Sequence, residues 1–442
     1  MQNHLNHHQQ PPSTSSTTRP STPCILLSAT LISLLLILTY TTTSSSPPSL
    51  PPPHPSLFPL DSPHRHLFRS SSSTTTTKTT TSLKTDQDPP PPPSPPSIAY
   101  LLSGSSNDTG RILRLLLSIY HPKNIYLLHL DSTASQAERD DLALKIQSFP
   151  LFKAAQNVNV VGKADVVYQQ GSSSISATLH GASILLRISK NWDWFINLSV
   201  DDYPLVTQDD LLHILSYLPK DLNFVNHTSY IGWIESRKLK PIIVDPGLYL
   251  LEENEVFYAT QKRLLPDAFR LFMGSSSAIL SRKFIEFCIL GIDNLPRTVL
   301  MYLANTPSSH SVYFPTILCN SRKFNRTTIN HNLQYVSLNS RKEPYLLNSS
   351  YYNDLVQSGA AFASRFLPDD PILHRLDQEI LHRGPGKPVP GGWCLGDSGL
   401  DACKVWGDAD VLRPGPGAKR LEKHLLELLS EGALRSQQCV VD

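Results

Sequence analysis

The chain lacks a large charge of either sign, closely spaced cysteines and internal repeats. Its 39 Lys and Arg residues nearly balance its 37 Asp and Glu residues, which leaves a formal net charge of +2. Nucleic-acid binding depends on concentrated positive charge, and no basic tail is present, so no nucleic-acid partner is expected. The absence of repeats excludes solenoid architectures.

Cysteines are also scarce, with six in the whole chain, and no pair of them has the close spacing of a zinc site. We therefore expect disulfides rather than a zinc site. Cys394 and Cys403 flank the loop WCLGDSGLDAC and are predicted to pair. Two of Cys288, Cys319 and Cys439 are expected to pair while one stays free, and the sequence leaves open which two.

Charged residues are missing from the run CILLSATLISLLLILTY, residues 24–40, which is at the short end of what spans a bilayer as a helix. Arg19 precedes the run, and the first charge after it is Asp61, so the positive-inside rule predicts a cytosolic N-terminus. We predict a cytosolic tail at 1–23 and a transmembrane signal-anchor at 24–40. A cleaved signal peptide is the alternative.

Core-forming residues are scarce between residues 41 and 96, where Pro, Ser and Thr dominate, as in DPPPPPSPP. Such sequence is extended and is predicted to form a stem that holds a lumenal domain, residues 97–442, away from the membrane. A plain disordered linker would be mechanically equivalent. Four sequons are predicted glycosylation sites, whereas Asn197 lies in a predicted buried strand and is not; the four are Asn107, Asn226, Asn325 and Asn348.

The globular part alternates between strand and helix patterns. Predicted strands cover residues 98–103, 124–131, 158–162 and 195–200, and predicted helices cover 111–120, 137–149, 176–187 and 418–432. This alternation predicts one α/β domain with a mostly parallel central sheet and helices on both faces. The strand before Asp201 and Asp202 marks a candidate ligand site, because open α/β sheets bind ligands at strand ends. Solvated aspartates at an ordinary strand exit are the alternative.

Several long motifs occur in a fixed order from Ile98 to Cys439: IAYLLSGS, YHPKNIYLLHLD, WDWFINLSVDDYPLVTQDDLL, FMGSSSAILSR, LPRTVLMYLAN and VLRPGPGAKRL. Together they resemble the plant branch of the core-2/I-branching glycosyltransferase family, which includes acetylglucosaminyltransferases, and especially its β-glucuronosyltransferases. The resemblance implies a GT-A-like fold and a type II Golgi membrane protein. It also implies inverting transfer from a UDP-sugar without a metal or other cofactor. The implied acceptor is a glycoprotein glycan such as the β-galactan of cell-wall arabinogalactan proteins.

On this resemblance, Asp131 is placed to bind uracil or ribose, and Lys163 and Tyr168 are placed beside the nucleotide. Asp202 is expected to form a polar floor of the donor site, since adjacent aspartates do not spell the metal-binding D-x-D motif. Asp408-Ala409-Asp410 spells that motif late in the chain, and we attribute it to chance. Three cations near a helix start are predicted to neutralise the leaving diphosphate, namely Arg413, Lys419 and Arg420. For Asp131, Lys163, Tyr168 and these three cations, the alternative is that each is an ordinary solvated surface residue.

The acceptor half departs from the family pattern. Trp233, Glu235 and Arg237 are predicted to bind the acceptor sugar, although Trp233 could instead be a core residue. In the family, a glutamate in a segment like SSPEGYFHTVICN is the general base, whereas SSHSVYFPTILCN here places Ser311 at that position and His310 before it. A family Trp-Asp pair is likewise replaced by Leu338 and Asn339.

Two functional hypotheses follow. The first is an active UDP-sugar-dependent transferase in which either His310 or a carboxylate from another segment serves as the general base. The second is a catalytically impaired family member that binds a nucleotide sugar or glycan, or supports an active partner. Expected partners are a UDP-sugar, a glycan acceptor, the membrane and other Golgi transferases in a complex.

Overall fold

The computed structural model describes residues 94–228, 231–249, 255–339, 344–396, 402–430, 432 and 439. The predicted tail, signal-anchor and nearly all of the predicted stem lie outside these residues. No helix among the described residues is long and apolar enough to cross a membrane. All described residues fall within a single unit, residues 62–442.

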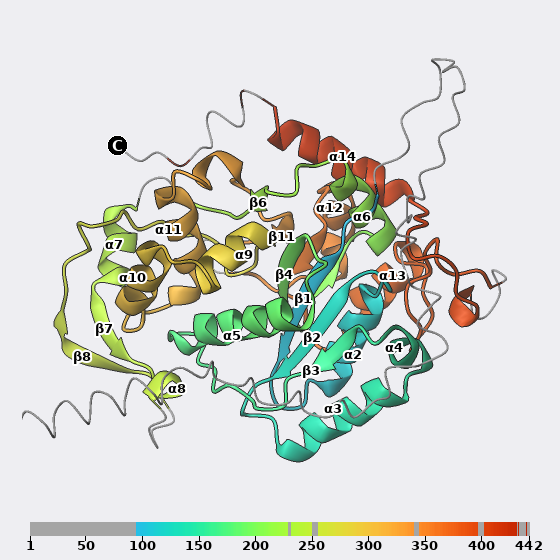
Figure 1. Ribbon diagram of the computed structural model, residues 1–442, viewed down its shortest axis with the longest axis horizontal. Helices are drawn as coiled ribbons and strands as arrows, with labels where there is room; N and C mark the ends of the chain where they lie inside the picture. Colours follow the sequence, from blue (N-terminus) through green and yellow to red (C-terminus); the bar gives the residue numbers. More distant parts are fainter. Residues whose placement is uncertain are drawn as a thin grey trace, which may run out of the picture. The chain divides into compact units, whose positions relative to one another are not determined.

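A seven-stranded sheet with the order β10-β6-β9-β4-β1-β2-β3 forms the centre of this unit (Figure 1). Its strands are β1 Ile98–Gly104, β2 Ile125–Leu130, β3 Val158–Val160, β4 Trp194–Ser199, β6 Asn223–Phe224, β9 Ile279–Ser281 and β10 Thr328–Ile329. Strand β9 runs antiparallel to both of its neighbours, and every other adjacent pair is parallel. The predicted α/β class with a mostly parallel sheet is confirmed.

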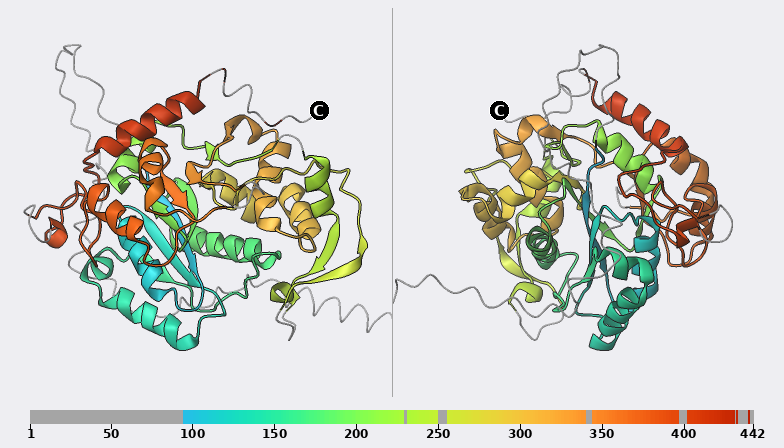
Figure 2. Two further views of the ribbon diagram at one scale, coloured as in Figure 1. Left: turned by 180° about the vertical axis from the view of Figure 1, so that it is seen from behind. Right: turned by 45° about the vertical axis from the view of Figure 1, so that its right-hand side comes forward.

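The central strands read as continuous apolar runs because both faces of the sheet are covered. In β1, Tyr100 and Leu102 pack into one buried cluster, while Ala99 and Leu101 pack into another on the opposite face. The helices that pack on the first face are α2 Thr109–Ser118, α3 Gln136–Ser148, α4 Pro150–Ala155, α6 Gln208–Ser216, α12 Tyr352–Gln357, α13 Pro371–Glu379 and α14 Pro416–Leu428. The other face is covered by α5 Ser173–Ile188, α9 Arg282–Ile289, α10 Asn294–Leu303 and α11 Tyr313–Asn320 (Figures 1 and 2).

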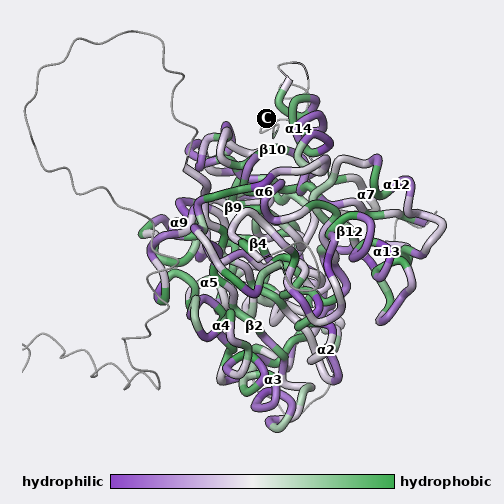
Figure 3. Tube along the Cα trace, turned by 90° about the vertical axis from the view of Figure 1, so that its right-hand side faces the viewer, coloured by the Kyte–Doolittle hydropathy of each residue, from purple (hydrophilic) through white to green (hydrophobic). Residues whose placement is uncertain are grey.

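Smaller elements complete the unit. A three-stranded sheet joins β11 Gln334–Val336, β12 Phe362–Ser364 and β5 Asp202–Pro204, and a hairpin joins β7 Pro241–Val244 to β8 Phe257–Lys262. Short helices α7 Trp233–Leu239 and α8 Pro246–Tyr249 flank the hairpin (Figure 1). In Figure 3 the hydrophobic segments gather around β2 and β4 in the interior. The sequence did not predict α13 or the hairpin, and it did not predict β5, β11 and β12, which have three residues each, too few to show a period.

The disulfide prediction is confirmed. Cys394 and Cys403 are bonded with an S–S distance of 2.11 Å, and Cys319 pairs with Cys439 at 2.05 Å. Cys288 is the free thiol. The Cys319–Cys439 bond therefore ties the end of the chain to α11.

The contact between α5 and β1 generates a stability prediction. A Cβ at Gly181 would lie 2.7 Å from the buried Leu101 side chain, whereas a Cβ at Gly110 in α2 would meet nothing within 4 Å. Overpacking of this kind costs about 1–3 kcal/mol, so Gly181→Ala should lower the free energy of unfolding by that amount. Gly110→Ala, the matched helical control, should not lower it. Urea unfolding of both variants tests this, and equal stabilities would contradict the tight packing.

Candidate active site

The parallel strands bring three loops to one edge of the sheet, the edge at their carboxyl ends. The backbone amide of Asp131, directly after β2, donates to the Gly104 carbonyl at the end of β1 (3.0 Å). After β4, the Val200 amide donates to the Ser103 carbonyl (3.0 Å). The segment after β3 joins them, since the Ser132 amide donates to the Asp165 carbonyl (2.9 Å). Ligands of open α/β sheets bind at such an edge.

Asp131 is half-buried at this edge. Its Oδ1 accepts hydrogen bonds from the backbone amide of Thr133 (2.9 Å) and from the Thr133 hydroxyl. Its Oδ2 has no hydrogen-bond partner among the described residues, so that oxygen is available to a ligand hydroxyl or imide. Lys163 is exposed just after β3, and the half-buried Tyr168 follows, with its amide donating to Ser173 Oγ (2.8 Å). The structure thus places Asp131, Lys163 and Tyr168 along one edge.

A polar cluster that the sequence did not predict lies beside them. His180 Nδ1 of α5 is 2.8 Å from Asp165 Oδ2, and the Asp165 amide donates to His129 Nε2 (3.2 Å). Burial lowers the pKa of His129, which therefore stays neutral and accepts this bond. His129 lies within the apolar LLHL run of β2, so the sequence shows it only as part of a strand.

Asp201 and Asp202 face different surroundings. Asp202 is buried, with Oδ2 accepting from the Ser199 amide (2.7 Å) and Oδ1 accepting from Gln334 Nε2 (2.8 Å). Burial raises the pKa of Asp202 to about 6, against the effect of these hydrogen bonds. Its carboxylate joins the strand end to the three-stranded sheet, which fits the predicted polar floor.

Asp201, by contrast, pairs with cations at the surface. Its Oδ1 lies 2.7 Å from Arg111 Nη2, and its Oδ2 lies 3.5 Å from Nε of Arg365, which is half-exposed. The sequence did not predict either arginine. The available signal for Arg111 was its place in the first turn of the helix after β1, whereas Arg365 follows β12, a strand too short to recognise.

The segment expected to supply the base lies against the start of α5. His310 Nδ1 is 3.1 Å from Ser174 Oγ, and the Ser308 amide donates to the Gln170 carbonyl (3.0 Å). Burial lowers the pKa of His310, so its imidazole is neutral at pH 7. Ser311 Oγ donates to the Ser308 carbonyl (2.9 Å). This segment is therefore connected, through the turn before α5, to the edge that carries Tyr168.

A carboxylate also lies at this turn. Buried Asp245 accepts from the Ser173 amide through Oδ2 (2.7 Å) and from the Gly247 amide through Oδ1 (2.8 Å). Both oxygens therefore stabilise backbone amides, including one in the first turn of α5. Asp245 is therefore a structural carboxylate in this conformation.

The cations of the RPGPGAKR segment lie elsewhere. The Arg413 amide donates to Asp209 Oδ2 (2.6 Å), and the adjacent Gln208 accepts from Asn124 Nδ2 (2.9 Å), immediately before β2. Asn124 and Asp131 are separated by the whole of β2, roughly 20 Å at ~3.3 Å per residue. The structure therefore places the Arg413 backbone near the amino end of β2, away from Asp131, and its role at a diphosphate stays a prediction.

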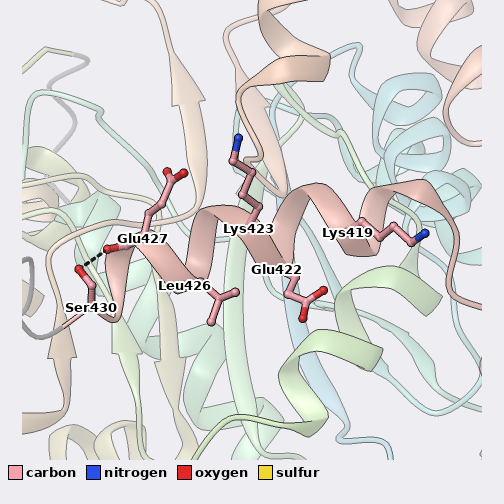
Figure 4. Close-up of a pocket in the computed structure, with 6 residues that line it drawn as sticks. All are labelled: Lys419, Glu422, Lys423, Leu426, Glu427 and Ser430. Carbon is pink, nitrogen blue, oxygen red and sulfur yellow. Dashed lines mark hydrogen bonds between the residues drawn. The ribbon is translucent and has the colours of Figure 1, made fainter.

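Lys419 and Arg420 follow on α14, which begins beside Arg413. Figure 4 shows the exposed face of this helix, where Lys419 and Lys423 alternate with Glu422 and Glu427. Arg420 Nη2 donates to the Leu205 carbonyl (3.4 Å), on the way from β5 to α6. A surface with both signs of charge matches the solvated alternative for Lys419 rather than a diphosphate site.

The predicted acceptor residues lie on α7. Trp233 is 70% exposed, so the alternative of a core tryptophan is excluded. The guanidinium of Arg237 stacks over its ring at 4.6 Å from the centroid. The side chain of Glu235 is outside the described part of the structure. An exposed aromatic ring with an adjacent cation can pack against a sugar, and the acceptor role stays a prediction.

Comparison with known proteins matches residues 98–349 to the Core-2/I-Branching enzyme family model. The chain is 51% identical over 345 residues to Beta-glucuronosyltransferase GlcAT14A of Arabidopsis thaliana, with 77% of each chain covered. It is 49% identical over 346 residues to GlcAT14B of the same plant, covering 77% of this chain and 80% of the relative. This chain belongs to the Core-2/I-branching family. The family predicted from the motifs is thereby confirmed.

Among solved structures, mouse xyloside xylosyltransferase 1 aligns at 9% identity with a TM-score of 0.29, covering 60% of this chain and 97% of that one. A likeness this weak carries no argument, and the GT-A assignment stays a prediction. The family match covers the carboxyl-edge residues between 98 and 349, and both Arg365 and Arg413 lie beyond it. In the Asp408-Ala409-Asp410 sequence, which spells the metal-binding D-x-D motif, Asp410 forms an ion pair with Lys123.

The sequons of this family member differ in accessibility. Asn107 and Asn348 are exposed, whereas Asn325 is half-buried. Asn226 is also half-buried, and its amide exchanges hydrogen bonds with Asn332 (3.2 Å each). Asn197 lies in β4, where its side chain bonds Ser276 and Ala278. Asn107 and Asn348 are therefore the sequons most open to a glycan.

The buried carboxyl of Asp202 generates a pH prediction. Its pKa rises from 3.8 to about 6 on folding, so the folded protein holds this proton more tightly than the unfolded chain. Its stabilising contribution is complete below pH 4 and is lost as pH rises from about 4 to about 6, by up to about 3 kcal/mol. Asp202→Asn should remove that step.

Urea unfolding at several pH values between 4 and 7 measures this loss of stability. An exposed carboxyl, Asp267, supplies the control variant Asp267→Asn, which should follow the unsubstituted protein. Parallel stability curves for Asp202→Asn and the unsubstituted protein would contradict the assignment.

Proposed function

We propose that this chain transfers glucuronic acid from a UDP-sugar to a glycan such as the β-galactan of arabinogalactan proteins, with inversion of the anomeric centre. The observation that carries the proposal is identity of about half over three quarters of the chain to two β-glucuronosyltransferases. Fold likeness alone would not name a reaction. The open oxygen of Asp131 at the carboxyl edge supplies a place for the nucleotide.

The proposed transfer does not use a metal ion held by Asp201 and Asp202. Asp202 directs both oxygens to protein donors, and Asp201 is paired with Arg111 and Arg365. The charge of a leaving diphosphate must still be met by fixed cations. Among the described residues of this edge, Lys163 is exposed and Arg365 is half-exposed, so both cations are open to a ligand.

His310 is proposed as the general base. Its lowered pKa keeps the imidazole neutral at pH 7, and a neutral imidazole can accept the proton of an acceptor hydroxyl. The buried imidazole of His310 is, in turn, a weaker base than an exposed histidine. Ser311 cannot take a proton at this pH, and Asp245 is held by backbone amides. These observations also favour the second candidate function, a member that binds a nucleotide sugar or glycan without turnover, or supports an active Golgi partner.

The proposed location is the Golgi membrane with type II topology. It rests on the apolar run at residues 24–40, the following Pro/Ser/Thr-rich segment and the sequons, of which Asn107 and Asn348 are exposed.

A transfer assay on the full chain tests the proposal, with a panel of UDP-sugars, β-galactan oligosaccharides, and chelator present or absent. His310→Ala should lower kcat by about 10²–10⁴-fold, the usual loss when a base is removed. Ser311→Glu should restore activity to that variant. The control His213→Ala, on α6, should change kcat less than about twofold. Activity should also persist below pH 6.5, since burial lowers the pKa of His310.

Failure of every donor to react, with UDP binding intact, would instead establish the non-catalytic candidate. Loss of activity in chelator would contradict the metal-free mechanism.

A further inference from the structure

A cavity of about 630 Å³ that the proposed reaction does not use is lined by residues of α2, α3, α4 and α13. Its buried floor includes Leu117 and Phe152, and its exposed rim includes Ser148, Gln378 and the Gly-Pro-Gly turn at 384–386. The volume is within the usual range of about 300–1,000 Å³ for small-ligand sites. The cavity is large enough to hold part of an oligosaccharide.

One wall of the cavity is apolar and aromatic. The rings of Phe149 and Phe152 stack with centroids 4.5 Å apart, and Leu113 and Leu117 of α2 extend the apolar surface. Phe149 is only half-buried. An aromatic surface of this kind suits the apolar C–H face of a pyranose ring, while Ser148 and Gln378 at the rim can bond its hydroxyls.

Another part of the cavity lining carries an excess of positive charge, with Arg114, Arg383 and Lys145 against Asp377. Arg114 Nη2 lies 2.9 Å from Asp377 Oδ2, and Arg383 Nε lies 2.6 Å from Asp377 Oδ1. The Tyr203 hydroxyl also donates to Asp377 (2.6 Å). Two guanidinium groups therefore share one carboxylate, and the side chains of Arg114, Asp377 and Arg383 are 16%, 10% and 3% exposed. Buried charge that is not fully paired favours an anionic ligand.

Arg114 retains the geometry to bind that ligand. Its Nε and Nη2 are used by Tyr203, Asp377 and His374, but Nη1 makes no hydrogen bond to any described residue. The nearest acidic atom in an ion pair with Nη1 is Asp369 Oδ1 at 3.9 Å, on a side chain that is 90% exposed and lines a neighbouring cavity that Arg114 also lines. Guanidinium groups bind carboxylates strongly when their donors are free.

Lys145 adds a second cation at the rim. It pairs with Asp141 on the same helix, but both side chains are about half exposed, and such pairs contribute little. Its amine can therefore turn to a ligand carboxylate at small cost. His374, next to Arg114, completes the polar side of the cavity.

We propose that this cavity binds a uronic acid residue of an acidic glycan, with the carboxylate at Arg114 and Lys145 and the ring against Phe149. The combination of apolar wall, hydroxyl partners and surplus cations matches a carboxylated sugar better than a neutral one. The choice of glucuronate among uronates rests on the proposed function.

The position of the cavity suggests its use. A neighbouring cavity of about 490 Å³ shares Gly110 and Arg114 with it and extends to Arg111 and Val200 at the carboxyl edge. A glycan held by its uronate beside α2 thus has a path toward the candidate active site. The site retains acceptor chains that already carry glucuronate, so that further transfer occurs on the same chain.

Calorimetric titration of the full chain with two matched ligands tests the proposal. One ligand is a β-galactan oligosaccharide bearing a single glucuronate, and the other is the same oligosaccharide with the carboxyl reduced to a primary alcohol. The uronate form should bind at least tenfold more tightly, and the difference should shrink as salt rises.

Lys145→Glu should lower affinity for the uronate form at least tenfold and leave the reduced form unaffected, and Phe149→Ala should weaken both. Lys153→Glu, an exposed lysine of α4 outside the cavity, is the charge-matched control and should change neither. Because Lys145 is exposed, Lys145→Glu should keep the melting temperature of the unsubstituted protein.

Equal affinity for the two ligands, no loss in Lys145→Glu, or displacement of the oligosaccharide by UDP-glucuronate would overturn the inference. Absence of glucuronosyl transfer with the Lys145-dependent preference intact would overturn the proposed function alone.

Discussion

The register of β1 between β2 and β4 is the constraint on which the rest of the structure depends. Gly104 pairs with Leu130 and Ser103 with Ser199, so all three strands end together. A Cβ at Gly104 would lie 3.0 Å from Asp108 and 3.1 Å from Val200. The loops can converge this closely because glycine occupies the crossing point. Polar groups far apart in sequence then line one edge.

A second constraint divides the adjacent aspartates. After β4 the chain leaves the main sheet, and β5, which begins at Asp202, pairs with β12. This pairing turns the Asp202 carboxylate into the interior and leaves Asp201 facing two arginines. One aspartate thereby supports the fold while its neighbour orders cations. Comparable division occurs near α5, where Asp245 stabilises the helix start and His310 remains titratable. In both places a buried aspartate accepts hydrogen bonds from backbone amides, and a nearby side chain carries the functional group of the candidate site.

Sequence patterns predicted the parts of the fold that repeat over many residues. The strands at Ile98 and Ile125, the helix α5 and the Cys394–Cys403 bond all follow from local periodicity or spacing. Arg365 escaped prediction because β12 is three residues long and its partner β5 lies far away in the chain. The position of Arg413 escaped prediction for a related reason. Its charge and glycine-rich context resemble an anion site, but only the Asp209 contact shows which edge of the sheet it approaches.

The central claim is that a nucleotide binds at the carboxyl edge and not beside α14. Hydrogen–deuterium exchange of the full chain with and without UDP tests it most directly, since bound ligand slows local opening of the segments it contacts. The account predicts protection at residues 104–111, 131–133 and 163–174 and unchanged exchange at 411–420. Protection confined to residues 411–420 would contradict it.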